Sequence, residues 1–128
     1  MVRDTARAVG NQVERFAESF LREHGLRTIA RNYRCRRGEI DLIMMDGSCL
    51  VFVEVRFRSA NRLSSARSTV DARKQRKIVR TAAMYLSSNR AYANYIMRFD
   101  VVGVDRNRNG GERVQWIRDA FRPAESFL

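Results

Sequence analysis

The sequence predicts an α/β protein with a mixed β-sheet flanked by helices, in the order α-β-β-β-α-β-β. Two stretches with apolar residues at three- and four-residue steps predict amphipathic helices over about 5–24 and 69–88. Five shorter apolar runs separated by Gly-containing turns predict strands. At 128 residues the chain has the length of one domain, 1–128.

The elements follow from local signals. The first helix is expected to end at Gly25, since a left-handed residue commonly closes a helix. A polar loop rich in Ser and Arg, 59–68, precedes the second helix, and the strand after that helix is expected to pair in parallel with the strand before the loop. Residues 1–8 and 122–128 are expected to fray. The predicted strands, of which the last is expected at a sheet edge, are 26–33, 39–45, 48–58, 97–104 and 113–121.

The charge is strongly basic. Lys and Arg total 25 against 14 acids, a net charge of +11 with a pI near 11.1, and all but Lys74 and Lys77 are arginine. A domain pI above 9 and guanidinium groups that bind phosphate bidentately favour nucleic acid as the partner, with solubility as the simpler alternative. The predicted contacts are Arg34, Arg36, Arg37, Arg58, Arg62, Arg67, Arg73, Lys74 and Lys77.

Several function classes are disfavoured. No apolar run reaches the roughly 18 residues that span a membrane, and the N-terminal stretch has no apolar signal segment, so a cytoplasmic location is expected. Cys35 and Cys49 are isolated, which is typical of a reducing compartment. With His24 as the single histidine, a zinc site or a Ser-His-Asp triad is not supported.

Two acids interrupt the apolar strands on either side of Asp46-Gly47. Asp41 lies in the first strand and Glu54 in the second, where an unpaired buried carboxylate would be costly. A two-residue Asp-Gly turn places Asp41 diagonal to Glu54, and a four-residue loop places them directly opposite. A three-residue loop places them on different faces of the hairpin. Two of these three registers therefore bring the carboxylates together.

Strand alternation assigns the neighbouring side chains. Glu39, Asp41 and Ile43 are expected on one face of the first strand, and Glu54 and Arg56 on one face of the second. Neighbouring carboxylates repel, and a hard divalent cation with oxygen ligands removes the conflict while it polarises a phosphoryl oxygen. The simpler alternative is a buried salt bridge, either between Glu54 and Arg56 or between Asp41 and an arginine.

Five stretches carry a family resemblance: ARNYR (30–34), GEIDLI (38–43), VFVEVR (51–56), KQ (74–75) and RFDVV (98–102). The pattern D-x12-E-x-[KR] across a strand–turn–strand resembles the PD-(D/E)XK nucleases, which have the restriction-endonuclease-like fold. Nearly the whole chain resembles the YraN family of uncharacterised bacterial proteins, which are similar to archaeal Holliday-junction resolvases. The resemblance implies a Mg²⁺- or Mn²⁺-dependent endonuclease that cuts structured or branched DNA and forms a homodimer.

The resemblance also implies roles for individual residues. Asp41 and Glu54 match the metal-binding acids of the superfamily, and the main-chain carbonyl of Val55 would be a third ligand. Glu14, in E-x-x-A on the first helix, matches an acid that reaches the site in resolvase-like members; a solvated helix position is the alternative. Arg56 stands where the motif usually has lysine.

Arginine stays protonated up to a pKa of roughly 13, so Arg56 would act by fixed charge and not as a general base. Gln75, on the inner face of the second helix, is expected to bond a site carboxylate or a water, and Glu39 to have an outer-sphere or surface role. Asp100 is expected to form a structural ion pair. Where family members carry glycines in the loop after the motif, this chain has Ser64-Ser65.

Three functions compete at this point. The first is a Mg²⁺-dependent nuclease, which the intact acid pair favours. The second is a nucleic-acid-binding protein of the same fold with weak or no catalysis, which Arg56 favours. The third is a basic protein that docks on an acidic protein partner or the ribosome.

Overall fold

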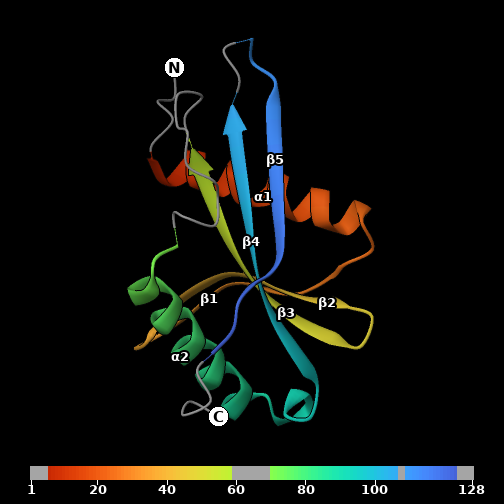
Figure 1. Ribbon diagram of the computed structural model, residues 1–128, viewed down its shortest axis with the longest axis vertical. Coiled ribbons are helices and arrows are strands. Elements are labelled where there is room, and N and C mark those ends of the chain that lie inside the picture. The colour runs from red at the N-terminus through yellow and green to blue at the C-terminus, as the bar shows by residue number, and fades with distance from the viewer. Residues whose placement is uncertain (1–5, 59–69, 107–108, 124–128) are drawn as a thin grey trace.

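The computed structural model describes residues 6–58, 70–106 and 109–123 (Figure 1). Its sheet has five strands in the order β1-β2-β3-β4-β5, with β3 and β4 parallel and the other neighbours antiparallel. This mixed sheet and the element order confirm the predicted fold class. The elements are α1 (Ala6–Glu23), β1 (Arg27–Cys35), β2 (Gly38–Asp46), β3 (Cys49–Arg58), α2 (Ala72–Ser88), the 3-10 helix η2 (Arg90–Tyr92), β4 (Ile96–Arg106) and β5 (Glu112–Phe121).

Each helix covers one face of the sheet. On one side, Val13, Ala17 and Leu21 of α1 pack with strand residues such as Leu42 and Val53. On the other side, α2 packs its apolar stripe on a second layer of strand residues that includes Ile43 and Phe52. Successive side chains of a strand point to opposite faces, so the central strands contribute residues to both core layers. The two helices lie over different parts of the sheet (Figure 1). None of the described helices is long and apolar enough to cross a membrane.

The first helix ends where the sequence predicts. Gly25 has φ +95°, and the amide of Leu26 donates to the carbonyl of Leu21 at 3.1 Å. His24 is a helix-end residue whose Nδ1 donates to the carbonyl of Phe20 at 2.8 Å. Residues 6–8 belong to α1, and 1–5 and 124–128 lie outside the described residues, so the fraying of 1–8 and 122–128 stays a prediction.

The second helix begins later than predicted. It starts at Ala72 because Asp71 caps it: the carboxylate of Asp71 accepts the amide of Lys74 at 2.9 Å. Gly38, at the β1–β2 turn, has φ +150°, and a Cβ there would lie 2.9 Å from Oγ1 of the buried Thr81. Because of this close approach, the start of β2 lies against the middle of α2.

The β2–β3 turn differs by one residue from the prediction. Asp46 pairs with Cys49, so the turn residues are Gly47-Ser48 and not Asp46-Gly47, with Gly47 at φ +61°. The ladder continues as Met44 with Val51 and as far as Leu42 with Val53. One step further, this register places position 41 opposite 54, which is the arrangement predicted for a four-residue loop.

Candidate metal and nucleic-acid site

Asp41 interrupts the ladder between β2 and β3. The backbone pairs end at Leu42 and Val53, and beyond them the amide of Val55 donates to Oδ2 of Asp41 at 2.7 Å. The N–H and C=O groups of one strand residue point to the same side of the strand. The carbonyl of Val55 therefore also opens toward β2, beside the carboxylate of Asp41.

Alternation along β2 breaks at the same place. Ile40 and Ile43 both lie in the core layer of α2, whereas Leu42 lies in the layer of α1. Strict alternation would separate Ile40 from Ile43, so the prediction that Glu39, Asp41 and Ile43 share one face by simple alternation was wrong. The physical reason is the local irregularity that lets a side-chain carboxylate take the place of a backbone acceptor.

Glu54 is buried at the centre of a loose cluster of charges. It is 5% exposed, and its Oε1 lies 3.5 Å from Nη1 of Arg56 and 3.7 Å from Nζ of Lys74. The ion pair with Arg56 is the one that the simpler sequence interpretation expected. Lys74, which the sequence suggested only as a phosphate contact, comes from the first turn of α2.

Both acids have raised pKa values, and the charge of Asp41 acts on Glu54. Burial raises the pKa of Glu54, and the nearby charge of Asp41 raises it further, against the lowering effect of Lys74 and Arg56. Burial also raises the pKa of Asp41, although the hydrogen bond from the Val55 amide lowers it; the charge of Glu39 adds to the rise. The electrostatic interaction fits the predicted proximity of the carboxylates.

Glu14 approaches the same region from α1. Its Oε1 is buried and has no hydrogen-bond partner among the described residues. Its pKa is raised to about 7 by burial first and then by the charges of Asp41 and Glu39. Glu14 lines a polar hollow together with Arg34, Asp41 and others, which argues against the solvated-helix alternative.

The oxygen donors suit a hard divalent cation. Within the described part of the chain, no group of three or more His, Cys, Asp or Glu side chains is close enough to hold a metal ion. The candidate donors are the carboxylates of Asp41 and Glu54 and the Val55 carbonyl, and Mg²⁺ or Mn²⁺ would complete such a set with water. A bound cation would relieve the repulsion between the two carboxylates. Direct ligation of a metal ion by Glu14 stays a prediction.

Gln75 does not contact the acids. Its amide nitrogen donates to the carbonyl of Val70 at 2.9 Å and not to a site carboxylate, whereas the alternative of a bond to water stays a prediction. The cause is the start of α2, where the side chain of Gln75 is used to hold the residue before the Asp71 cap. Asp100, by contrast, forms the structural ion pair that was predicted, with Arg98.

Basic side chains surround the acids. Lys74, Lys77 and Arg34 line a second hollow with Glu39, and Oε1 of Glu39 lies 3.3 Å from Nε of Arg34, consistent with an outer role for Glu39. Arg36, Arg37 and Arg73 are exposed. Arg58 ends β3, and nothing is described for its side chain; Arg62, Arg67 and the Ser64-Ser65 loop lie outside the described residues.

The fold and this arrangement define an α/β protein with a five-stranded mixed sheet flanked by helices, in which the half-buried Asp41 and the buried Glu54 lie on neighbouring strands. The chain belongs to a family described as "Uncharacterised protein family UPF0102", whose model matches residues 13–104. A UPF0102 protein of Nitrosospira multiformis is 51% identical over 117 residues, covering 91% of this chain and 95% of that protein. One from Pseudomonas syringae pv. syringae is 42% identical over 121 residues, covering 94% and 98%.

The chain also has a weak structural likeness to a solved protein structure. It is described as the structure of Pyrococcus furiosus SfsA in complex with Ca²⁺ and is 14% identical, with a TM-score of 0.37. The match covers 88% of this chain and 63% of that chain, so this chain spans less than two thirds of SfsA. A likeness of this size adds nothing to the description of the site.

Proposed function

We propose that this protein is a metal-dependent endonuclease that hydrolyses phosphodiester bonds in structured or branched DNA. The observation that supports it is the pair Asp41 and Glu54: two acids with raised pKa values, placed beside the Val55 carbonyl and within reach of two cations. Perturbed, clustered acids next to phosphate-binding groups are typical of catalytic sites.

Each residue of the site would have a separate role. Asp41, Glu54 and the Val55 carbonyl would hold Mg²⁺ or Mn²⁺, which when bound supplies a Lewis acid for the phosphoryl group. Arg56 offers a permanent charge for the negative charge that develops in the transition state, since arginine keeps its proton. Lys74, whose Nζ approaches the same Oε1 of Glu54 as Arg56 does, would supply a second positive charge for a bound phosphate.

A second candidate is a nucleic-acid-binding module of the same fold with weak or no catalysis. Arg56 favours it, because the residue that replaces the usual lysine forms an ion pair with Glu54, and a buried acid neutralised in this way can be purely structural.

The test is a cleavage assay with purified protein on junction, flap and single-stranded substrates, titrated with Mg²⁺ and Mn²⁺. Glu54→Gln should abolish cleavage and leave binding intact or tighter, because one negative charge facing the phosphates is removed. Glu23→Gln, an exposed acid at the end of α1, is the matched control. Wild-type protein that binds but cleaves no substrate at any metal concentration would leave the binding module as the function.

Binding itself should be dominated by phosphate contacts. With a net charge of +11, affinity is expected to fall steeply between about 50 and 200 mM salt, as the release of condensed counterions requires. The slope of log affinity against log salt, measured by fluorescence anisotropy, checks this. A nearly flat slope would contradict nucleic acid as the partner and favour an acidic protein.

A further inference from the structure

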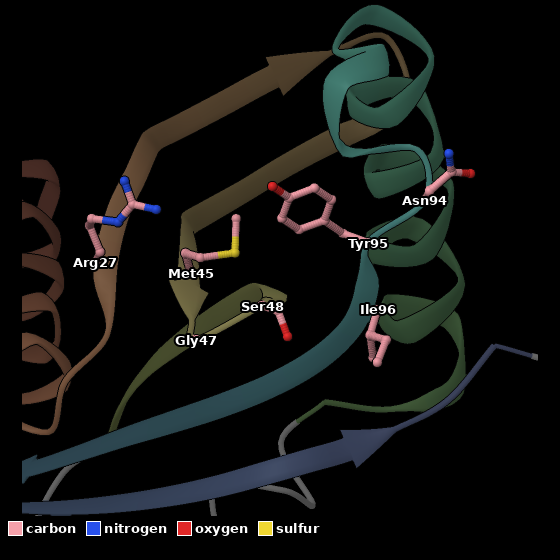
Figure 2. Close-up of a pocket in the computed structure, with 7 residues that line it drawn as sticks. All are labelled: Arg27, Met45, Gly47, Ser48, Asn94, Tyr95 and Ile96. Carbon is pink, nitrogen blue, oxygen red and sulfur yellow. The ribbon is translucent and has the colours of Figure 1, made fainter.

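A third hollow lies at the other end of the β2–β3 hairpin, by its turn. It has a volume of about 450 Å³ and is formed by Arg27 of β1, Ser48 of the turn, and Asn94, Tyr95 and Ile96 at the start of β4, among others (Figure 2). The size is within the usual range of roughly 300–1,000 Å³ for small-molecule sites. Neither the acid pair nor its surrounding cations take part in it.

The hollow contains the exposed ring of Tyr95, which packs on other tyrosine rings. Tyr95 is 43% exposed and Ile96 71%, and they are two of the four large apolar residues exposed in the described part of the chain. The ring of Tyr95 packs edge-on against Tyr92 at 5.4 Å, and Tyr92 stacks on the buried Tyr85 at 6.4 Å. The ring is therefore fixed by the core before any ligand arrives, so little entropy is lost on binding.

The polar groups around this ring suit a nucleotide. Arg27 is exposed and forms no ion pair with any described residue, and no acid lines the hollow. Asn94 offers an amide and Ser48 a hydroxyl, which can each donate and accept at the edge of a base. An aliphatic side chain of a protein partner would use the ring but leave Arg27 and Asn94 without matching groups. A base that stacks on Tyr95, with its phosphate near Arg27, would use all of them.

The hollow and the acid pair lie at opposite ends of α2. Lys74 near Glu54 is in the first turn, and Tyr95 follows the last turn by way of η2. A helix of 17 residues is about 25 Å long. The intervening surface of α2 carries the exposed Arg76, Lys77 and Arg80, and the helix contains no acid, so a phosphate backbone can follow it from one site to the other.

We propose that this hollow is a base-binding subsite, which takes one unpaired base of a single-stranded segment stacked on Tyr95. The inference rests on the proposed function in one respect, that the ligand is nucleic acid. It adds that the substrate carries single-stranded nucleotides next to a duplex, with the single strand held by Tyr95 and the duplex near the acid pair.

The test compares two DNA probes by fluorescence anisotropy in the presence of EDTA: a duplex with a single-stranded overhang and a blunt duplex of the same total charge. Tyr95→Ala should weaken binding of the overhang probe roughly tenfold or more, the usual scale for losing one stacked base, and leave the blunt duplex within twofold. Tyr95→Phe keeps the ring and should bind both probes as the wild type does. Phe16→Ala, which removes another exposed aromatic ring, is the matched control.

Three results would overturn the proposal. Tyr95→Ala could leave the binding of both probes unchanged, it could weaken the binding of both equally, or the wild type could bind neither probe. A 5-iodouracil in the overhang that crosslinks to Tyr95 would support it directly. The two proposals fail separately. Loss of the Tyr95 effect with metal-dependent cleavage intact removes the subsite alone, and a Tyr95-dependent overhang preference without cleavage removes the nuclease alone.

Discussion

Two buried acids on neighbouring strands are held in opposite ways. Asp100 of β4 is fully buried and accepts four hydrogen bonds at 2.8–3.0 Å, two from Arg98, one from Nε1 of Trp116 and one from the amide of Asp119. Glu54 of β3, 5% exposed, has a raised pKa, and the described cations nearest to it lie at 3.5 and 3.7 Å. Burial alone therefore does not distinguish a structural acid from a candidate catalytic one.

The difference lies in how fully each carboxylate is satisfied. Both oxygens of Asp100 already accept two donors each, which leaves no room for a ligand. The positive φ of Asp119, +52°, turns its amide toward Asp100, at the irregularity in the β4–β5 ladder between Phe99 and Val101. Among the described residues, Glu54 instead has only Arg56 and Lys74, both at its Oε1, so it is held less closely than Asp100.

The largest effect is expected from removing a partner of the satisfied acid. Asp100→Asn should lower the free energy of unfolding by about 3 kcal/mol, because the donors from Trp116 and Asp119 lose a charged acceptor and Arg98 keeps only Asp46 as a counterion. Glu54→Gln should change it by less than about 1 kcal/mol or raise it, since a repelled carboxylate is removed. Urea unfolding measures both, and equal losses would break the comparison.

The next effect is on rate. Arg56→Ala should reduce cleavage on the order of a hundredfold, the usual scale for one group that stabilises transition-state charge. Arg56→Lys should keep measurable activity with a changed pH profile, since lysine supplies the charge and also titrates. Arg113→Ala, an exposed arginine on the opposite edge strand, serves as the control. Unchanged cleavage by Arg56→Ala would assign Arg56 to structure, like Arg98.

A smaller effect concerns pH. The pKa of Glu54 is raised from 4.5 to about 8, so its contribution to stability is fully present below about pH 4.5 and is lost as the pH rises through 8. The Tm of the wild type should therefore fall relative to that of Glu54→Gln between these values. Mn²⁺, which binds the ionised form, should raise the wild-type Tm more at pH 8 than at pH 6. A metal effect independent of pH would contradict the assignment of Glu54 as a ligand.

The smallest effect repeats the comparison within α1, between Glu14 and Glu18 one turn apart. Glu18 accepts from Thr28 at 2.5 Å and from Arg31 at 2.9 Å, and these hydrogen bonds lower its pKa although burial opposes them. Glu18→Gln should lower the free energy of unfolding by only about 1 kcal/mol, because the partner Arg31 is largely exposed. This difference between variant and wild type should disappear as the pH falls through the lowered pKa of Glu18. Glu14→Gln should be neutral or stabilising near pH 8. Paired thermal melts decide whether the two acids differ as expected.

Much of the fold followed from local patterns in the sequence. The bounds of α1, β1 and β5 lie within two residues of the prediction, because apolar periodicity and Gly25 act locally. The proximity of position 41 to 54 was predicted by register parity, although the turn residues were off by one. Contacts made by α2 could not be predicted, since its placement depends on the Asp71 cap and on the approach of Gly38 to Thr81. For that reason Gln75 was assigned to the site and the contact of Lys74 with Glu54 was missed.

The hydrogen bond from the Val55 amide to Asp41 gives the protein a built-in spectroscopic probe. An amide proton bonded to a carboxylate resonates downfield, and it shifts when that carboxylate gains a proton or a cation. A ¹⁵N-labelled sample would thus report occupancy of the site through one backbone signal, without nucleic acid and without any substitution. The neighbouring amide of Val53, which lies within the regular ladder, supplies the internal reference in the same spectrum.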